Sequence, residues 1–246
     1  MTKTFVANKR LVLIVLAVGL MACQSERKSP LFIQMEELAQ QGNPEAQYHL
    51  GMMYNNGLGV KQDSGKAFSW FSKAADSGEP LASYKLGCYY SGQFGEVQVD
   101  AAKSSLYKLI AADAGYSFAQ ADVGNIYFQK GSYDEAIKWW KLAASQGYPP
   151  ALGNLSFSFF EGKIIPQDKV LAYAYFKLAN VDLAGELTAE AQKGLGTLAE
   201  AMTADEIEKA EKIVSDWKAE PTPLTTRATI GMQDAKRVIE ESKNKR

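Results

Sequence analysis

The sequence predicts an all-α protein, in which helix-turn-helix repeats stack into a right-handed α-solenoid with helical caps. The first observation behind this prediction is a block of about 36 residues that recurs four times, with turn glycines at Gly42, Gly78, Gly115 and Gly147. The second is that small and aromatic residues return at the same positions of every block. Because a repeat of this length packs only on its neighbours, the chain is expected to form one continuous array.

The first 22 residues resemble the signal peptide of a bacterial lipoprotein. Basic residues precede an apolar run, Leu11 to Ala22, which is too short to span a membrane and suits a secretory signal. The run ends in Leu20-Met21-Ala22-Cys23, which is similar to a lipobox. This resemblance implies cleavage before Cys23 and attachment of acyl chains to that cysteine. The alternative is an ordinary signal anchor with an incidental cysteine.

Residues 23–30 are then expected to form a lipidated tether to the membrane. Two or more acyl chains on Cys23 would anchor the protein stably. The next residue is Gln24 rather than aspartate, which resembles lipoproteins of the outer membrane in a Gram-negative host. The resemblance therefore implies a lipid anchor on the periplasmic side of the outer membrane.

The predicted solenoid covers residues 31–219 and begins with a capping helix, Leu31 to Ala39. In the first full repeat, Asn43-Pro44 is typical of the start of a helix. Ala46, Leu50 and Tyr54 then follow at intervals of four residues and define one helix face. Gly51 weakens this helix by about 1 kcal/mol relative to alanine, so we expect a neighbouring helix to approach it closely.

The second helix of each repeat has its own start signal and a large aromatic residue. Aspartates open three of these helices, and the shortened third repeat carries Ser132 to Glu135, which predicts a capping box. The aromatic residue is expected to fill the space between helices. The aromatic residues of repeats 1 to 4 are Trp70, Tyr107, Trp139 and Tyr175, in that order. The aspartates of repeats 1, 2 and 4 are Asp63, Asp100 and Asp168.

This pattern resembles Sel1-like repeats, which are relatives of tetratricopeptide repeats. The full repeats lie at about 44–79, 80–116, 117–148 and 149–183. The fourth departs from the pattern, since Ser156 replaces the helix glycine and Asn180 replaces an alanine. The resemblance is specific for the fold, and it implies a protein-binding surface more than catalysis.

A C-terminal cap is predicted at 184–219, followed by a proline-containing linker at 220–246. The cap comprises a helix from Glu186 to Ala201 and a second helix that opens with a capping box, Thr203 to Glu206. Beyond Pro221-Thr222-Pro223, the residues from Thr229 to Arg246 can form a tail helix. We do not expect this tail to dock firmly on the solenoid.

Few residues could support catalysis, a metal or a cofactor, and we expect none of these. The single histidine, His49, is interpreted as a partly exposed helix residue. With Cys23 acylated, Cys88 has no partner for a disulfide. Removal of residues 1–22, which hold three of the 27 basic residues, leaves a net charge of −4. This charge does not favour nucleic acid, which calls for a basic surface.

The candidate binding site is the concave face of the array, which the first helix of each repeat lines in tetratricopeptide-type proteins. Register counting places an aromatic and amide-rich strip there, and such a strip suits a peptide- or helix-binding groove. Alternatively, several of these aromatics pack between repeats, and whether Cys88 is buried stays open. The predicted binding residues are Tyr48, Met52, Asn55, Tyr84, Cys88, Phe118, Asn125, Phe128, Phe157 and Phe160.

These observations favour a lipid-anchored periplasmic scaffold or adaptor that binds another protein or peptide. A more specific hypothesis within this class of binding proteins is an immunity-type inhibitor of a secreted membrane-active toxin, because lipoproteins with Sel1-like repeats resemble such inhibitors. An envelope hydrolase is the main alternative from another class, and it would need a cluster of titratable residues. A third possibility is a structural spacer, which would tolerate mutations in the concave strip.

Overall fold

The computed structural model describes residues 28–94, 97–181 and 186–244. The expected signal peptide and the acylated Cys23 lie outside these residues. Within them the chain forms helices and no strand, apart from an isolated bridge between Val181 and Leu187. None of the described helices is both long and apolar enough to cross a membrane.

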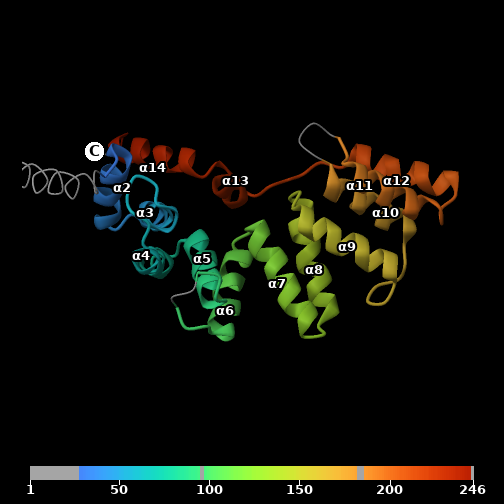
Figure 1. Cartoon of the computed structure of the whole chain (residues 1–246), viewed down its shortest axis with the longest axis horizontal. Coiled ribbons are helices and arrows are strands. Elements are labelled where there is room, and N and C mark those ends of the chain that lie inside the picture. Colours follow the sequence, from blue (N-terminus) through green and yellow to red (C-terminus); the bar gives the residue numbers. More distant parts are fainter. Residues whose placement is uncertain (1–27, 95–96, 182–185, 245–246) are drawn as a thin grey trace, which may run out of the picture.

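Four helix pairs form the body of the protein and stack in chain order into an arc (Figure 1). Each pair packs on the next, which confirms the predicted α-solenoid. The pairs are α3 (Pro44–Asn56) with α4 (Ser64–Asp76), α5 (Pro80–Tyr90) with α6 (Ala101–Asp113), α7 (Ser117–Gln129) with α8 (Tyr133–Ser145), and α9 (Pro149–Glu161) with α10 (Lys169–Asn180).

Helix starts follow the predicted capping signals with one exception. The side chain of Asn43 accepts a hydrogen bond from the Ala46 backbone N–H, and Asp63 caps α4 in the same way. The capping box predicted at Ser132 is wrong, because Ser132 makes no side-chain cap hydrogen bond. The short turn before α8 places its φ and ψ at −86° and 74°, outside the extended range in which the other N-caps lie.

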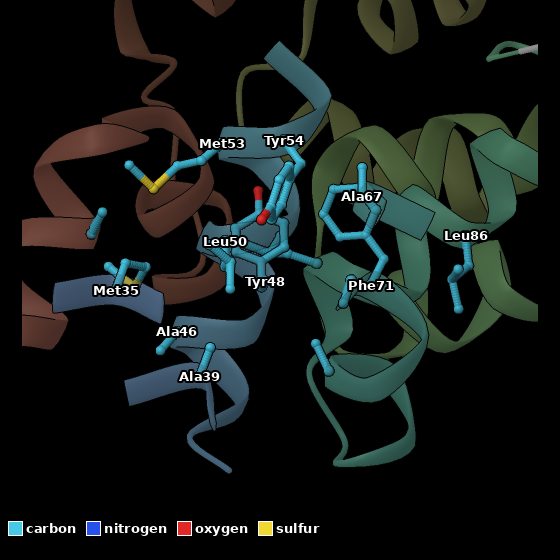
Figure 2. Close-up of a cluster of buried hydrophobic side chains, with 14 of the residues drawn as sticks. Met35, Ala39, Ala46, Tyr48, Leu50, Met53, Tyr54, Ala67, Phe71 and Leu86 are labelled. Carbon is cyan, nitrogen blue, oxygen red and sulfur yellow. The ribbon is translucent and has the colours of Figure 1, made fainter. Parts of the chain in front are cut away.

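The core of the first repeats is continuous and dominated by small and aromatic side chains (Figure 2). Ala46, Leu50 and Tyr54 are all buried, as their spacing predicted. Leu50 lies among side chains from α2 (Pro30–Gln40), α4 and α5 in the same cluster. The helix α2 therefore caps the array by covering the outer side of α3.

The helix glycines mark close approaches between paired helices. A Cβ atom at Gly51 would lie 2.7 Å from the Phe71 ring, and one at Gly124 would lie 2.4 Å from Trp140. The close approach expected at Gly51 is confirmed. The aromatic residue that fills the space is one position later than predicted, because Phe71 is fully buried whereas Trp70 is half-buried.

The C-terminal part comprises a cap and a returning segment. Helices α11 (Ala189–Ala199) and α12 (Ala204–Asp216) pack on α10, and the capping box at Thr203 is present. Helices α13 (Pro223–Ile230) and α14 (Met232–Asn244) then run back across the open side of the arc to α2 and α3 (Figure 1). The expectation that this tail does not dock firmly is wrong.

Candidate functional site

A row of aromatic rings links the first helices of successive repeats. Tyr84 on α5 meets Tyr116 edge-on, with ring centroids 5.0 Å apart. Tyr116 stacks on Phe118 at 5.3 Å, and Phe118 contacts Tyr148 at 4.4 Å. Because Tyr116 and Tyr148 are the N-cap residues of α7 and α9, the row follows the ends of these helices from repeat 2 to repeat 4.

Four phenylalanines on α7 and α9 remain exposed, and we call them the aromatic patch. They are Phe118, Phe128, Phe157 and Phe160, with exposed fractions between 40% and 62%. Contiguous exposed apolar surface is typical of sites where a protein contacts another molecule. The aromatic patch is therefore the main candidate for a binding surface.

An amide pair lies within this patch and fixes how α7 and α9 face each other. The Asn125 side-chain oxygen accepts hydrogen bonds from Asn154 Nδ2 and from Trp140 Nε1, both at 3.0 Å. Phe128 and Phe157 each follow one of these asparagines by three residues, so they share its helix face. The patch thus combines aromatic surface with an amide that the fold holds in place.

A cleft of about 520 Å³ lies between α6 and α7 and borders the patch at Asn125. Val99 is exposed and also lines the cleft. On the cleft wall, Lys108 Nζ lies 2.7 Å from an Asp122 carboxylate oxygen. Lys130 adds a second cation to the lining, so the cleft is slightly positive.

The N-terminal half of the predicted strip is more enclosed than the C-terminal half. Tyr48 is buried, and Met52, Asn55 and Tyr84 are half-buried. Asn55 accepts a hydrogen bond from the Tyr89 hydroxyl at 2.9 Å, which fixes its amide inside the array. The strip therefore does not form one open groove, and the accessibility predicted for Tyr48 is wrong.

Cys88 is buried beside Tyr84, Lys85 and Lys108. Burial raises the pKa of the Cys88 thiol, and the two lysines only partly oppose this effect. A buried thiol with a raised pKa behaves as a small core residue. Cys88 does not contribute an accessible group to the concave face.

His49 is only 2% exposed, so its interpretation as a partly exposed residue is wrong. Its Nε2 atom lies 2.9 Å from an Asp234 carboxylate oxygen, across 185 residues of sequence. The physical reason is that α14 covers the side of α3 that would otherwise face solvent. Sequence analysis missed this contact because it treated the tail as undocked.

A network of charges surrounds this pair. Arg237 donates hydrogen bonds to Asp234 and to Glu45, both at 2.7 Å, and Arg227 bonds Glu45 at 2.7 Å and also Glu79. Burial alone would raise the pKa of Asp234, but the hydrogen bonds from His49 and Arg237 outweigh it and lower that pKa. Burial raises the pKa of Glu79, with Arg227 opposing. These contacts hold the tail on the first two repeats.

In the part of the chain that the structure describes, no group of three or more histidine, cysteine, aspartate or glutamate residues could hold a metal ion. Glu45, Glu79 and Asp234, which the strap brings together, are paired with arginines.

Comparisons with known proteins agree with this architecture. A family model described as the Sel1 repeat matches residues 44–79, 80–116, 117–148 and 149–180. A Sel1 repeat protein from Oxalobacter formigenes aligns with a TM-score of 0.59 and 31% identity, over 68% of this chain and 48% of that chain. No curated protein matches the chain.

A second solved structure is a protective antigen present in uropathogenic Escherichia coli strains. It aligns with a TM-score of 0.58 and 21% identity, over 80% of this chain and 50% of that chain. An immunity protein from Pseudomonas aeruginosa aligns with a TM-score of only 0.37, which supports no conclusion about this chain. This chain spans about half the length of the first two structures. Because the family model covers more than half of the sequence, the chain belongs to the Sel1 repeat family.

Proposed function

We propose that this chain is a lipid-anchored scaffold or adaptor that binds another protein through its aromatic patch. Sel1 repeat proteins generally mediate protein–protein interactions. The observation that carries the proposal is the exposure of four phenylalanines on α7 and α9, with Phe157 at 62%. Aromatic side chains are enriched among the residues that dominate binding energy at protein interfaces.

The geometry of the patch suits a protein or peptide better than a small molecule. The exposed rings spread over two helices and do not converge into an enclosed pocket. Asn125 and Asn154 supply a hydrogen-bonding point between them. A partner surface with apolar side chains around a polar centre would match this arrangement.

We also propose that acyl chains on Cys23 anchor the protein to the periplasmic side of the outer membrane. The support is the basic and apolar N-terminus, the sequence Leu20-Met21-Ala22-Cys23, and Gln24. Helix α2 begins at Pro30. The six residues between Cys23 and this helix span at most about 20 Å, so the array would stay close to the membrane.

The binding proposal is tested by crosslinking and affinity capture from native membranes. The test variant is Phe128→Glu/Phe157→Glu, which places two charges in the patch. The matched control is Leu106→Glu/Ile110→Glu on α6, where both side chains are also exposed. We expect a specific partner with the wild type and the control, and its loss with the patch variant. Retention of the partner by the patch variant would contradict the proposal.

The anchoring proposal has a separate test. Cys23→Ser should abolish incorporation of a labelled fatty acid and should deplete the protein from the outer-membrane fraction. Equal outer-membrane association of wild type and Cys23→Ser would show that acylation does not anchor the chain there.

A further inference from the structure

The returning C-terminal segment, residues 219–244, forms a strap along one edge of the solenoid. It starts at the turn after α8, where the Glu220 backbone N–H donates to the Ser145 carbonyl at 2.9 Å. It ends on α2 and α3, at the opposite end of the array (Figure 1). The strap therefore contacts all of the first three repeats and occupies a face that the array would otherwise leave open.

The first part of the strap is held by hydroxyl and amide groups. Thr225 Oγ1 donates to the Gln146 side chain at 2.7 Å and accepts from the Ser117 backbone N–H at 3.0 Å. Thr222 Oγ1 donates to the Gly115 carbonyl at 2.9 Å. These contacts place the strap directly beside Tyr116, the residue that joins the aromatic row to Phe118.

The second part is held by charge and by a short apolar stripe. Arg227 forms salt bridges with Glu45 and Glu79, which lie at the N-terminal ends of α3 and α5. Arg237 forms a second salt bridge with Glu45. Ala235, Val238 and Ile239 are buried in the same cluster as α2 and α3. The groove on α2, α3 and the start of α5 thus holds two short helices, with one arginine on α13, one on α14 and the apolar stripe on α14.

The strap covers part of the strip that the sequence placed on the concave face. Arg227 and Asp234 lie near the Tyr48 phenol, whose pKa burial raises. With the strap in place, Tyr48 is buried and the open aromatic surface is limited to repeats 3 and 4. Release of the strap would expose Tyr48 and add it to the accessible aromatic surface.

The fit of the strap is incomplete. Among the described residues, the buried Arg227 Nε atom has no hydrogen-bond partner, and it lies 3.8 Å from Asp234. Glu79 carries its charge in a buried position, which burial disfavours. Between α12 and α13, residues 218–221 are exposed and Pro221 interrupts regular structure. A ligand that satisfied these groups better would compete with the strap.

We propose that the strap is an autoinhibitory internal ligand, and that its groove on α2, α3 and α5 accepts a partner segment of two short helices, with an arginine on each and an apolar stripe on the second. This inference rests on the proposed role of the aromatic patch in protein binding. The partner segment takes the place of α13 and α14, pairs its arginines with Glu45 and Glu79, and extends the binding surface from the aromatic patch to Tyr48. Until then the strap restricts binding to repeats 3 and 4.

The test uses the full-length chain and a fluorescent synthetic peptide of residues 220–244 as the probe, with binding followed by anisotropy. The variant Arg227→Ala/Arg237→Ala weakens the internal ligand and leaves the groove intact. We expect it to bind the peptide at least tenfold more tightly than the wild type does. A peptide with the same two substitutions should bind at least tenfold more weakly, and Glu45→Gln/Glu79→Gln in the groove should abolish binding.

A matched control is Lys209→Ala/Lys212→Ala on α12, which removes two exposed cations away from the groove and should bind like the wild type. No gain of peptide binding in the strap variant would overturn the proposal. Equal binding of the peptide without the two arginines would also overturn it, because the groove would then not discriminate by the arginines.

Hydrogen exchange of the wild-type chain gives a second measurement that needs no variant. We expect amides of α13 and α14 to exchange faster than those of α3, through openings that leave the repeats protected. If the strap exchanges only together with α3, it is a permanent part of the fold and the proposal fails. Neither measurement involves the aromatic patch, so retention of the partner by the Phe128→Glu/Phe157→Glu variant would refute the proposed function without deciding this inference.

Discussion

Replacement of Gly124 by alanine tests whether the close helix approach within a repeat contributes to stability. The added Cβ atom would lie 2.4 Å from Trp140 Cδ1 and 3.2 Å from the Ala136 carbonyl oxygen. Trp140 is buried, and its Nε1 donates to Asn125, so its ring cannot shift without disturbing that hydrogen bond. A small side chain at this position therefore forces the paired helices α7 and α8 apart.

The expected change in the free energy of unfolding combines one stabilising and two destabilising effects. Alanine stabilises a helix interior by about 1 kcal/mol relative to glycine. Overpacking of a core costs roughly 1–3 kcal/mol, and weakening of the Trp140 hydrogen bond costs about 1 kcal/mol more. We expect Gly124→Ala to lower the free energy of unfolding by about 1–3 kcal/mol. Gly153 on α9 has no atom near the same position, so Gly153→Ala should raise it by about 1 kcal/mol.

Urea unfolding followed by circular dichroism compares the two variants, with the slope of the transition checked for a change in cooperativity. Since both sites are glycines within the first helix of a repeat, intrinsic propensity cancels in the comparison. If Gly124→Ala is as stable as Gly153→Ala, the close approach to Trp140 does not contribute to the free energy of unfolding. In a Trp140→Leu background, Gly124→Ala should cost less stability than it does in the wild type, because the smaller side chain makes room for the methyl group.

Three further outcomes are expected. The pKa of Asp234 is lowered, so its contribution to strap docking should persist down to about pH 4, the ordinary carboxylate range, and disappear as the pH falls further. Hydrogen exchange of α14 between neutral pH and this range measures the docking. Loss of protection already near neutral pH would point to another group. The Cys88 thiol is buried with a raised pKa, so iodoacetamide should label the native chain at least tenfold more slowly than the urea-unfolded chain at about pH 8, as measured by mass spectrometry. Thr203→Ala removes the capping box of α12 and should lower the free energy of unfolding by about 1 kcal/mol, whereas the exposed Thr197→Ala substitution should change it far less.

The repeats could be predicted because their signals are local and periodic. Ala46, Leu50 and Tyr54 occupy successive turns of one helix, so their spacing alone indicates the buried face. Gly51 costs helix propensity, which makes sense only where another helix comes close. The sequence could not show which aromatic meets this glycine, since Trp70 and Phe71 are adjacent and differ by about 100° around α4.

The strap was missed because its contacts leave no periodic pattern. His49 and Asp234 are 185 residues apart, and either residue alone is typical of an exposed helix position. Helix α3 is buried on nearly every side from Ala46 to Gly51, which the register of an open solenoid does not anticipate. A usable signal was present in α14, where Ala235, Val238 and Ile239 form an apolar stripe that needs a covering surface.

The candidate site is divided into an open half and a covered half because of the same long-range contacts of the strap. Register counting placed Phe128 and Phe157 on the concave face, and both are exposed because no later segment covers α7 and α9 at these positions. Tyr48 was placed by the same counting, but the strap arrives there from the other end of the chain. Register defines which helix face a residue occupies, and only tertiary contacts decide whether that face is open.

The strap also changes how the array should respond to force and to partners. In an open solenoid each repeat contacts only its neighbours, so the two ends are coupled weakly through all the units between them. Here the segment after α12 bonds the turn after α8 and then ends on α2 and α3, which ties the last units to the first. A change in curvature of the arc must therefore stretch the strap or displace it. We therefore expect a partner that bends the array at α7 and α9 to alter the contacts of Arg227 and Arg237 without touching them, and so to couple its own binding to docking of the strap.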